Sequence, residues 1–301
     1  MQTNITDNYK KPKVIAEIGC NHKGDFDIAK EMIKTAKIFC DADVVKFQKR
    51  SPEELLTEKQ YNEPHPVPHN SYGDTYGEHR EFLEFSYEQH KKLKEFAEEI
   101  GITYSTSVWD LTSAEEIVKL NPDFIKIPSA NSTYWELLEY LCVNYKGNIH
   151  LSTGMTTREE IEEIIEFFIK KNRNKDLVLY HCTSGYPVPF EDTKLLEIIK
   201  LKNKYKDKLK AIGFSGHHNG ISIDVAAYTL GAEWIERHYT LNRTWKGTDH
   251  AASLEPNGMR KLKRNLMATY DSLEFRPEGF LEIEKPQVKK LRWDREEYSE
   301  L

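Results

Sequence analysis

Two histidines, His217 and His238, are the residues with the clearest chemical meaning in this sequence. Each stands at or just beyond the end of a short apolar run, at 211–214 and 233–239, and an alanine-rich helical pattern separates the runs. This order predicts a strand, a helix and a second strand, with an imidazole at each strand end. In a parallel α/β fold these ends face the ligand crevice, so we expect both rings to converge on one metal ion or substrate. The alternative is two ordinary hydrogen-bonded histidines.

Other predicted strand ends also carry polar side chains. Lys46 and Lys126 interrupt buried patterns, where an ammonium group is tolerated only if it is paired or functional. The full set at the strand ends is Glu17, Lys46, Gln48, Thr106, Lys126, Ser129, Ser152, Thr153, Ser184, Tyr186, Ser215, His217, Glu236 and His238. Ammonium groups supply charge and hydroxyls supply directed donors. The set therefore predicts a pocket for a small dianion or trianion.

A metal site at the two histidines would be a catalytic one. Two neutral imidazoles leave coordination positions open, which suits Mn²⁺, Mg²⁺ or Zn²⁺ that also binds water and a substrate oxygen. Asp249 lies just past the second histidine, in Gly247-Thr248-Asp249-His250. We expect it to hold a metal-bound water or a substrate hydroxyl, the alternative being a turn-forming aspartate.

Eight strand–helix alternations position these residues. The predicted strands are 13–20, 43–48, 102–106, 123–127, 148–152, 177–182, 211–214 and 233–239, and the last helix is 256–273. This number and length predict a single-domain α/β protein, a (β/α)8 TIM barrel. The alternative is a doubly wound open sheet, but Gly19 and Gly24 do not make its Gly-rich phosphate turn.

The barrel is expected over residues 13–275, with an N-terminal extension at 1–12 and a C-terminal extension at 276–301. The C-terminal part is charged and without clear pattern, which predicts an irregular packed extension or strap. Segment 51–86 loses periodicity and is rich in Pro, His, Asn, Gly and Tyr. A connection of this length predicts a loop that covers the active site.

Composition excludes several classes of protein. A net charge of −6 argues against a nucleic-acid binder, and no apolar run is long enough to span a membrane. The polar start MQTNITDNYKKPK is unlike a signal peptide, so we expect a cytoplasmic protein. The four cysteines are widely separated, which predicts reduced thiols.

Eight sequence blocks resemble the sialic acid synthases. They are AEIGCNHKG (16–24), VVKFQ (44–48), IKIPS (125–129), LSTGM (151–155), HCTSGYP (181–187), GFSGHH (213–218), ERHYTL (236–241) and KGTDHAASLEP (246–256). The resemblance covers about residues 13–275. It implies a metal-dependent (β/α)8 barrel that condenses phosphoenolpyruvate with an open-chain N-acylhexosamine or its 6-phosphate. The products would be a nine-carbon 2-keto sugar acid and phosphate.

The resemblance also implies roles for individual residues. His217 and His238 would hold a divalent metal, with Mn²⁺ preferred over Mg²⁺. The residues expected around phosphoenolpyruvate are Lys46, Thr106, Lys126, Ser129, Ser152, Ser184, Tyr186 and Ser215. Glu17, Gln48 and Asp249 would lie beside the aminosugar acceptor or the metal-bound water, with Glu17 as a candidate base. The catalytic set is thus Glu17, Lys46, Lys126 and Asp249, and a homodimer is left open.

Two departures from the family pattern stand out. Asn131 occupies a place where many relatives have an acidic residue, and the printed sequence has no antifreeze-like domain after the barrel. Segments 70–86 and 244–250 look like the vertebrate-type branch, which uses hexosamine 6-phosphates. Lys49, Arg50, His79 and Arg80 are then candidates for holding a distal phosphate. The alternatives are a related keto-acid phosphate synthase with a deaminated or eight-carbon product, or a non-catalytic barrel that binds a partner in sugar-acid biosynthesis.

Overall fold

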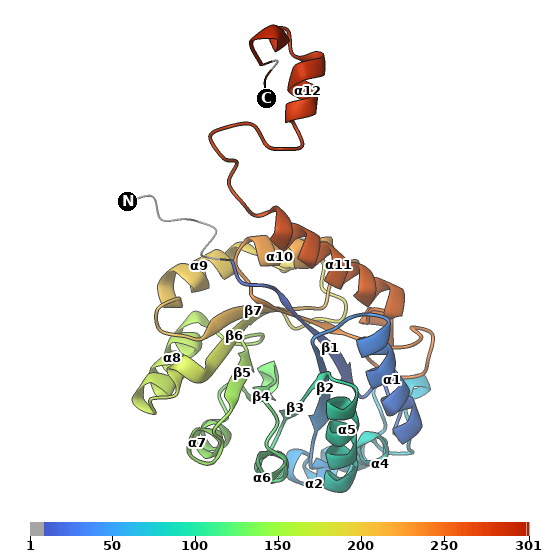
Figure 1. The fold of residues 1–301 in the computed structure, drawn as a ribbon. Helices are drawn as coiled ribbons and strands as arrows, with labels where there is room; N and C mark the ends of the chain where they lie inside the picture. The colour runs from blue at the N-terminus through green and yellow to red at the C-terminus, as the bar shows by residue number, and fades with distance from the viewer. Residues whose placement is uncertain (1–8, 299, 301) are drawn as a thin grey trace.

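Eight parallel strands pair in chain order and close into a barrel, with β8 beside β1, in the computed structural model, which describes residues 9–298 and 300 (Figure 1). The strands are β1 Lys13–Gly19, β2 Val44–Lys49, β3 Thr103–Val108, β4 Phe124–Ile127, β5 Asn148–Ser152, β6 Leu177–Cys182, β7 Ala211–Gly216 and β8 Trp234–His238. The predicted TIM barrel is confirmed. Within the described residues, no helix is both long and apolar enough to cross a bilayer.

The helices surround the barrel. They are α1 Phe26–Ile38, α5 Tyr87–Glu99, α6 Leu111–Leu120, α7 Trp135–Asn144, α8 Arg158–Lys170, α9 Leu196–Tyr205, α10 Ser222–Thr229 and α11 Pro256–Ser272. Local sequence sets their starts and their buried faces. In α8, for example, Thr157 and Glu160 form a capping box, and Ile164, Ile165 and Phe168 are buried at helical spacing.

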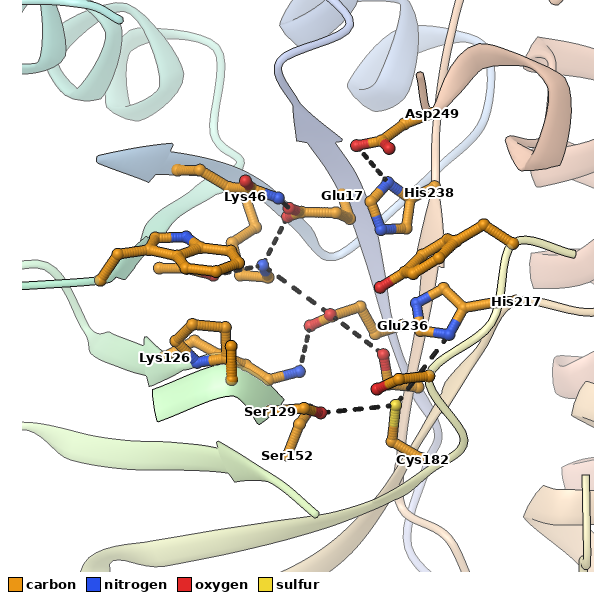
Figure 2. Close-up of a pocket in the computed structure, with 18 of the residues that line it drawn as sticks. Glu17, Lys46, Lys126, Ser129, Ser152, Cys182, His217, Glu236, His238 and Asp249 are labelled. Atoms are coloured by element: carbon orange, nitrogen blue, oxygen red, sulfur yellow. Dashed lines mark hydrogen bonds and ion pairs between the residues drawn. The ribbon is translucent and has the colours of Figure 1, made fainter. Parts of the chain in front are cut away.

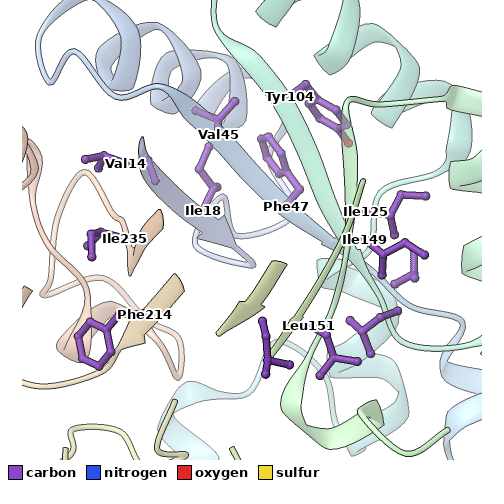
Figure 3. Close-up of a cluster of buried hydrophobic side chains, with 14 of the residues drawn as sticks. Val14, Ile18, Val45, Phe47, Tyr104, Ile125, Ile149, Leu151, Phe214 and Ile235 are labelled. Carbon is purple, nitrogen blue, oxygen red and sulfur yellow. The ribbon is translucent and has the colours of Figure 1, made fainter. Parts of the chain in front are cut away.

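Apolar side chains form one layer on each face of the strands. The larger layer lies between strands and helices and includes Val45, Phe47, Ile125, Ile149 and Leu151 (Figure 3). A smaller cluster comprises Ile15, Val44, Phe124, Val178, Tyr180 and Ala211, with Trp234 packed against it. Its members alternate along the strands with members of the larger layer, so they belong to the opposite, inward face. The inward cluster fills the barrel below the polar residues described next.

The connection from β2 to α5 contains regular structure, contrary to the sequence-based expectation. It holds α2 Pro52–Leu55, α3 Glu58–Asn62 and α4 Tyr76–Leu83. Both α3 and α4 begin at capping boxes, Thr57 with Gln60 and Thr75 with Glu78. These cap signals are present in the sequence, but the helices between them are too short to show an apolar period. We call residues 51–86 the insertion.

The C-terminal segment is also more ordered than expected. It contains α12 Lys285–Leu291 and a 3₁₀ turn, Arg295–Tyr298. The Arg292 guanidinium lies 5.3 Å from the ring centre of Phe280 and 4.5 Å from that of Tyr298, which ties the segment together. Figure 1 shows it extending away from the barrel, so it does not form the predicted strap over the barrel.

Candidate active site

Strand alternation decides which side chains enter the barrel. The register pairs Glu17 with Lys46 and with His238, and Lys46 with Ser105, so these inward positions lie side by side. On β1, β2, β4 and β8 the residue two places beyond an apolar residue of the inward cluster is charged, as Lys126 follows Phe124 and Glu236 follows Trp234. The carboxyl ends of the strands therefore build one polar pocket above an apolar floor.

The pocket is a cavity of about 220 Å³. Its polar and ionisable lining consists of Glu17, Cys20, Lys46, Gln48, Arg50, Arg80, Ser107, Trp109, Lys126, Ser129, Ser152, Cys182, Ser184, Tyr186, Ser215, His217, Glu236, His238, Thr248 and Asp249. Every residue of the predicted strand-end set is in this lining except Thr106 and Thr153, whose hydroxyl donates to the Tyr180 carbonyl at 2.9 Å. The structure thus brings together residues from all eight strand ends and the loops that follow them.

Thr106 was the wrong residue to choose on β3. It pairs in register with Phe47, which packs in the outer layer, and its hydroxyl donates to the Ser107 carbonyl at 3.3 Å. Ser107 has the opposite parity and lines the pocket, where its Oγ accepts a hydrogen bond from Lys46 Nζ at 2.8 Å. Sequence reasoning ended the strand at 106 and took its last residue, whereas β3 continues to Val108.

The two lysines are buried and paired with carboxylates. Lys46 Nζ lies 2.5 Å from Glu17 Oε2 and 3.7 Å from Glu236 Oε1, and Lys126 Nζ lies 2.9 Å from Glu236 Oε2. Lys126 Nζ also lies 3.8 Å from the ring centre of Tyr180. The ammonium groups are therefore paired, as the sequence analysis required of buried lysines, and they are parts of one network.

Glu236 is the centre of this network; the sequence analysis placed it in the strand-end set but assigned it no role. Figure 2 shows it between the lysines on one side and His217 on the other. Burial alone would raise the pKa of Glu236, but Lys126 and Lys46 outweigh burial and lower it to about 2. Burial lowers the pKa of Lys126, while Glu236 opposes this effect. Its position two residues before His238 gives it the same inward parity, which is the signal that could have identified it.

Four serine hydroxyl groups line the pocket wall near Cys182, and we call this part the serine wall. Ser129 Oγ accepts a hydrogen bond from the Gly154 backbone N–H at 3.1 Å and lies 3.7 Å from Cys182 Sγ. A Cβ on Gly154 would lie 2.7 Å from Ser129 Oγ and would also collide with the Ser184 hydroxyl. Glycine is thus required for these two serines to approach the backbone. Together with Ser152 and Ser215 they give the wall directed donors suited to an anion.

His217 and His238 face each other with ring centres 5.4 Å apart. His217 Nδ1 donates to the Thr183 carbonyl at 3.2 Å, which leaves the lone pair on Nε2. Burial and the neighbouring His238 lower the pKa of His217 to about 3, so the ring is neutral at physiological pH. Two imidazoles this close together are placed to share one cation.

The surroundings of His238 fit the same interpretation. Its Nδ1 is buried without a hydrogen-bond partner and lies 3.6 Å from Asp249 Oδ2. Burial would raise the pKa of Asp249, but His238, Arg50 and Arg80 lower it, so this carboxylate is ionised. Among residues 9–298 and 300 no three His, Cys, Asp or Glu side chains are grouped as a metal site. A cation here would thus take two imidazoles from the chain and its other ligands from water or substrate.

Gln48 and Tyr186 complete the predicted set. Gln48 Nε2 donates to Glu17 Oε1 at 2.7 Å, which orients that carboxylate. The ring of Tyr186 lies 4.4 Å from that of His217, and 55% of the residue is exposed at the pocket mouth. Tyr186 is therefore placed to contact a ligand that enters above the histidines.

The four cations proposed for a distal phosphate do not share one place. Lys49 Nζ pairs with Glu116 at 3.4 Å, and His79 is buried within the insertion; neither lines the pocket. Arg50 lines it, but its Nη1 lies 3.3 Å from Glu84 Oε1 and its guanidinium stacks 4.2 Å from the Trp109 ring centre.

Arg80 differs from these three. Its Nε and Nη2 donate to the Tyr76 hydroxyl at 3.0 and 2.7 Å, and in the described part of the chain it forms no ion pair with a carboxylate. It lines the pocket from α4, so the insertion does contribute to the site, as the sequence predicted for a covering loop. Arg80 is therefore the cation best placed to meet an incoming anion at the rim.

Asn131 lies outside the main pocket. It lines an adjoining cavity of about 240 Å³ together with Arg50, Arg80 and Trp109, and its Nδ2 donates to the Trp109 carbonyl at 2.9 Å. Its amide thus holds the end of β3 in place.

Comparisons with known proteins agree with one another. The model of the NeuB family matches residues 32–276. The chain is 42% identical over 253 residues to the N-acetylneuraminate-9-phosphate synthase of Mus musculus, which covers 84% of this chain and 68% of that protein. It is 35% identical to the N,N'-diacetyllegionaminic acid synthase of Campylobacter jejuni, over 84% of this chain and 75% of that one.

A solved structure is similar over nearly its whole length. It is the N-acetylneuraminic acid (sialic acid) synthetase from Leptospira borgpetersenii in complex with citrate. The TM-score is 0.78 at 29% sequence identity, covering 94% of this chain and 93% of the other.

Proposed function

Since this chain belongs to the NeuB family, we propose that it is a nonulosonate synthase that condenses phosphoenolpyruvate with an N-acylhexosamine 6-phosphate. The products are a nine-carbon 2-keto sugar acid phosphate and inorganic phosphate. The observation that carries the proposal is one pocket in which a lysine–carboxylate network and a serine wall lie beside two facing histidines. The relatives named above support the reaction class.

Phosphoenolpyruvate fits the deep half of the pocket. Lys126 has N–H groups beyond the one that pairs with Glu236, Lys46 adds a second positive charge, and Ser129, Ser152, Ser184 and Ser215 add hydroxyl donors. The carboxylates that pair with the lysines hold both ammonium groups in fixed positions before the substrate enters. This preorganisation is what a site needs to stabilise charge that moves between phosphate and carboxylate during the reaction.

The acceptor aldehyde is assigned to the histidine side. The proposed divalent cation, Mn²⁺ or Mg²⁺, would be held by His217 and His238 and would act as a Lewis acid toward the aldehyde oxygen. Asp249 lies beside His238 and would orient a water molecule or a sugar hydroxyl there. The methylene carbon of phosphoenolpyruvate then attacks the aldehyde carbon, and the aldehyde oxygen gains a proton to become a hydroxyl. Water adds to the resulting oxocarbenium carbon, which bears the phosphate, and loses a proton. Phosphate leaves from that carbon by C–O cleavage, which gives the 2-keto group.

Glu17 is the carboxylate we assign to proton transfer. Glu236 is held ionised as the counter-ion of two lysines, and Asp249 is held ionised by His238 and the arginines, so we assign both of these carboxylates positioning roles. Glu17 contacts Lys46 and Gln48 and lies between the two halves of the pocket. A base in this position can take a proton from the water that attacks the enol-derived carbon.

The phosphorylated form of the acceptor is supported by Arg80. This guanidinium stands at the rim, away from the serine wall, and has no carboxylate partner among the described residues. The synthases from Mus musculus and Homo sapiens, 42% and 41% identical to this chain, are named for 9-phosphate products. Carbon 9 of such a product corresponds to carbon 6 of the acceptor.

The test is a direct assay of phosphate release. The purified protein, with Mn²⁺ or Mg²⁺, is mixed with phosphoenolpyruvate and a panel of N-acylhexosamines and their 6-phosphates, and products are identified by mass spectrometry. We expect turnover with at least one 6-phosphate and a product mass equal to that of the acceptor plus one pyruvic acid. Absence of turnover with every acceptor, under conditions where the protein is folded, would refute the proposal.

A further inference from the structure

Two segments that are far apart in the sequence contribute to the rim of the pocket, beside Tyr186. The insertion contributes Arg80, and the loop between β8 and α11, residues 239–255, contributes Thr248 and Asp249. We call the latter the rim loop. A ligand that reaches the histidines passes between these two segments, so their relative position controls both access and the shape of the mouth.

One tyrosine joins the two segments. The Tyr72 hydroxyl donates to the Lys246 carbonyl at 2.5 Å, and Lys246 Nζ lies 4.7 Å from the centre of the Tyr72 ring. Within residues 9–298 and 300 this is the only hydrogen bond between the insertion and the rim loop.

On the insertion side, Tyr72 is fixed to the helix that carries Arg80. Its ring stacks on that of Phe82 at 5.0 Å with an interplanar angle of 6°, and its backbone N–H donates to His79 Nδ1 at 3.1 Å. Phe82 and His79 both belong to α4, as does Arg80. Any movement of Tyr72 is thus shared with Arg80.

On the other side, Lys246 is close in sequence to the pocket residues Thr248 and Asp249. The Asp249 carbonyl accepts a hydrogen bond from Ser253 Oγ at 2.7 Å. Ser253 Oγ in turn accepts a hydrogen bond from Asn21 Nδ2 at 2.9 Å. The far end of the rim loop is thereby tied to the loop after β1. The end nearer Lys246 is exposed at Arg243, Thr244 and Lys246, and the Tyr72 contact holds it.

We propose that Tyr72 is a positioning residue: its hydroxyl latches the insertion to the rim loop and so sets the distance between Arg80 and Asp249 across the pocket mouth. The latch consists of one neutral hydrogen bond and one cation–π contact, so it can open and close without unfolding either segment. An open latch lets ligands pass, and a closed latch forms the complete mouth.

Limited proteolysis tests the latch without reference to activity. The accepting carbonyl belongs to Lys246, so the bond that trypsin would cut lies directly at the contact. We expect Tyr72→Phe to speed cleavage after Lys246 by about threefold to tenfold, the effect of one lost hydrogen bond on the open population. Cleavage after the exposed Lys208 serves as an internal reference in the same digest.

Tyr61→Phe is the matched control. Tyr61 also lies in the insertion and its hydroxyl donates to Glu81 at 2.7 Å, but that bond stays within the insertion. Its removal should leave cleavage after Lys246 at the wild-type rate. Equal rates of cleavage in Tyr72→Phe and wild type would overturn the latch, as would equal acceleration by the two variants.

The consequence for the reaction rests on the proposed function and is measured separately. Tyr72→Phe should raise KM for the acceptor severalfold, with kcat and KM for phosphoenolpyruvate within about twofold of wild type, because the deep half of the pocket is untouched. Faster cleavage with unchanged acceptor KM would overturn the positioning role. Faster cleavage in a protein without any synthase activity would refute the proposed function and leave the latch standing.

Discussion

Lys126 and Glu236 form an ion pair inside the barrel, with Nζ 2.9 Å from Oε2 and both side chains almost fully buried. They are 110 positions apart in the sequence. Lys46 approaches the other oxygen of Glu236 at 3.7 Å, so one carboxylate serves two ammonium groups. The pocket therefore depends on charges that are stable only as a group.

Removing either partner should destabilise the protein. Lys126→Met or Glu236→Gln leaves an uncompensated buried charge, which costs about 3–5 kcal/mol of unfolding free energy. The double variant should recover most of that loss, while all three variants lose activity by at least about 10²-fold. Urea denaturation and the phosphate-release assay measure the two effects. Lys10→Met breaks the exposed pair with Glu233 and should cost no more than about 1 kcal/mol. Additive losses in the double variant would contradict the coupling.

Strand parity on β3 gives a second prediction. Ser107 supports Lys46 inside the pocket, so Ser107→Ala should lower kcat/KM by about tenfold, the effect of one lost hydrogen bond to a charged group. Thr106→Val keeps the shape of a side chain that points away from the pocket and should leave kcat/KM within about twofold. Steady-state kinetics with varied phosphoenolpyruvate distinguishes the two variants. A larger loss of kcat/KM in Thr106→Val than in Ser107→Ala would show that the inward face of β3 is assigned incorrectly.

The proposed metal site can be examined by binding as well as by activity. Chelation should abolish turnover, and adding Mn²⁺ or Mg²⁺ should restore it. Titration calorimetry with Mn²⁺ should show one site that His217→Ala or His238→Ala removes. Asp249→Asn should weaken binding by about 10–100-fold, as loss of a partner beside a ligand does. His69→Ala, an exposed histidine outside the pocket, is the control. Full activity after chelation would exclude a metal requirement.

Arg80 should discriminate between acceptors. Arg80→Ala is expected to lower kcat/KM for an N-acylhexosamine 6-phosphate by at least about tenfold, since a hydrogen bond to a charged group contributes about 1.5–3 kcal/mol. The value for the unphosphorylated sugar should change little. Lys49→Ala removes a cation that pairs with Glu116 outside the pocket. It should leave kcat/KM unchanged for both the phosphorylated and the unphosphorylated acceptor. Equal losses with both acceptors would assign Arg80 a role other than phosphate recognition.

Buried histidines should make stability fall in mild acid. Burial, with smaller effects from Lys49 and His22, lowers the pKa of His90 to about 3. Because the ordinary pKa of histidine is about 6.5, the unfolded chain binds this proton first as the pH decreases. The stabilising effect of neutral His90 is therefore complete above about pH 6.5 and is lost progressively toward pH 3, by at most about 1.4 kcal/mol per pH unit.

The variant His90→Gln isolates this contribution. His90 Nδ1 lies 2.6 Å from the Tyr104 hydroxyl, and glutamine can keep a hydrogen bond there without titrating. Unfolding free energies measured at pH 7, 6 and 5 should fall less steeply in His90→Gln than in wild type, whereas His69→Gln, at an exposed position, should follow wild type. Parallel curves for all three proteins would show that His90 is not the group being protonated.

The sequence by itself determined the barrel and most of the pocket lining. Eight apolar runs alternate with helical patterns, and a polar residue at each strand end must reach the same mouth once the strands are parallel. His217, His238, Lys46 and Lys126 could be identified in this way because local spacing fixes which end of the element they occupy. The insertion could be located, but its short helices could not, since they lack an apolar period.

Only the tertiary structure decided which charges meet. The pairing of Glu236 with both lysines joins β2, β4 and β8 through barrel closure, and no local pattern encodes that register. The choice of Ser107 over Thr106 depended on side-chain alternation along β3, which continues to Val108 and turns neighbouring residues to opposite faces. Arg80 and Tyr72 reach the rim through the fold of the insertion against the rim loop, a contact between segments more than 170 positions apart. The spacing of residues along the sequence specifies which side chains stand at each strand end. Closure of the barrel and docking of the loops specify which other side chains they contact.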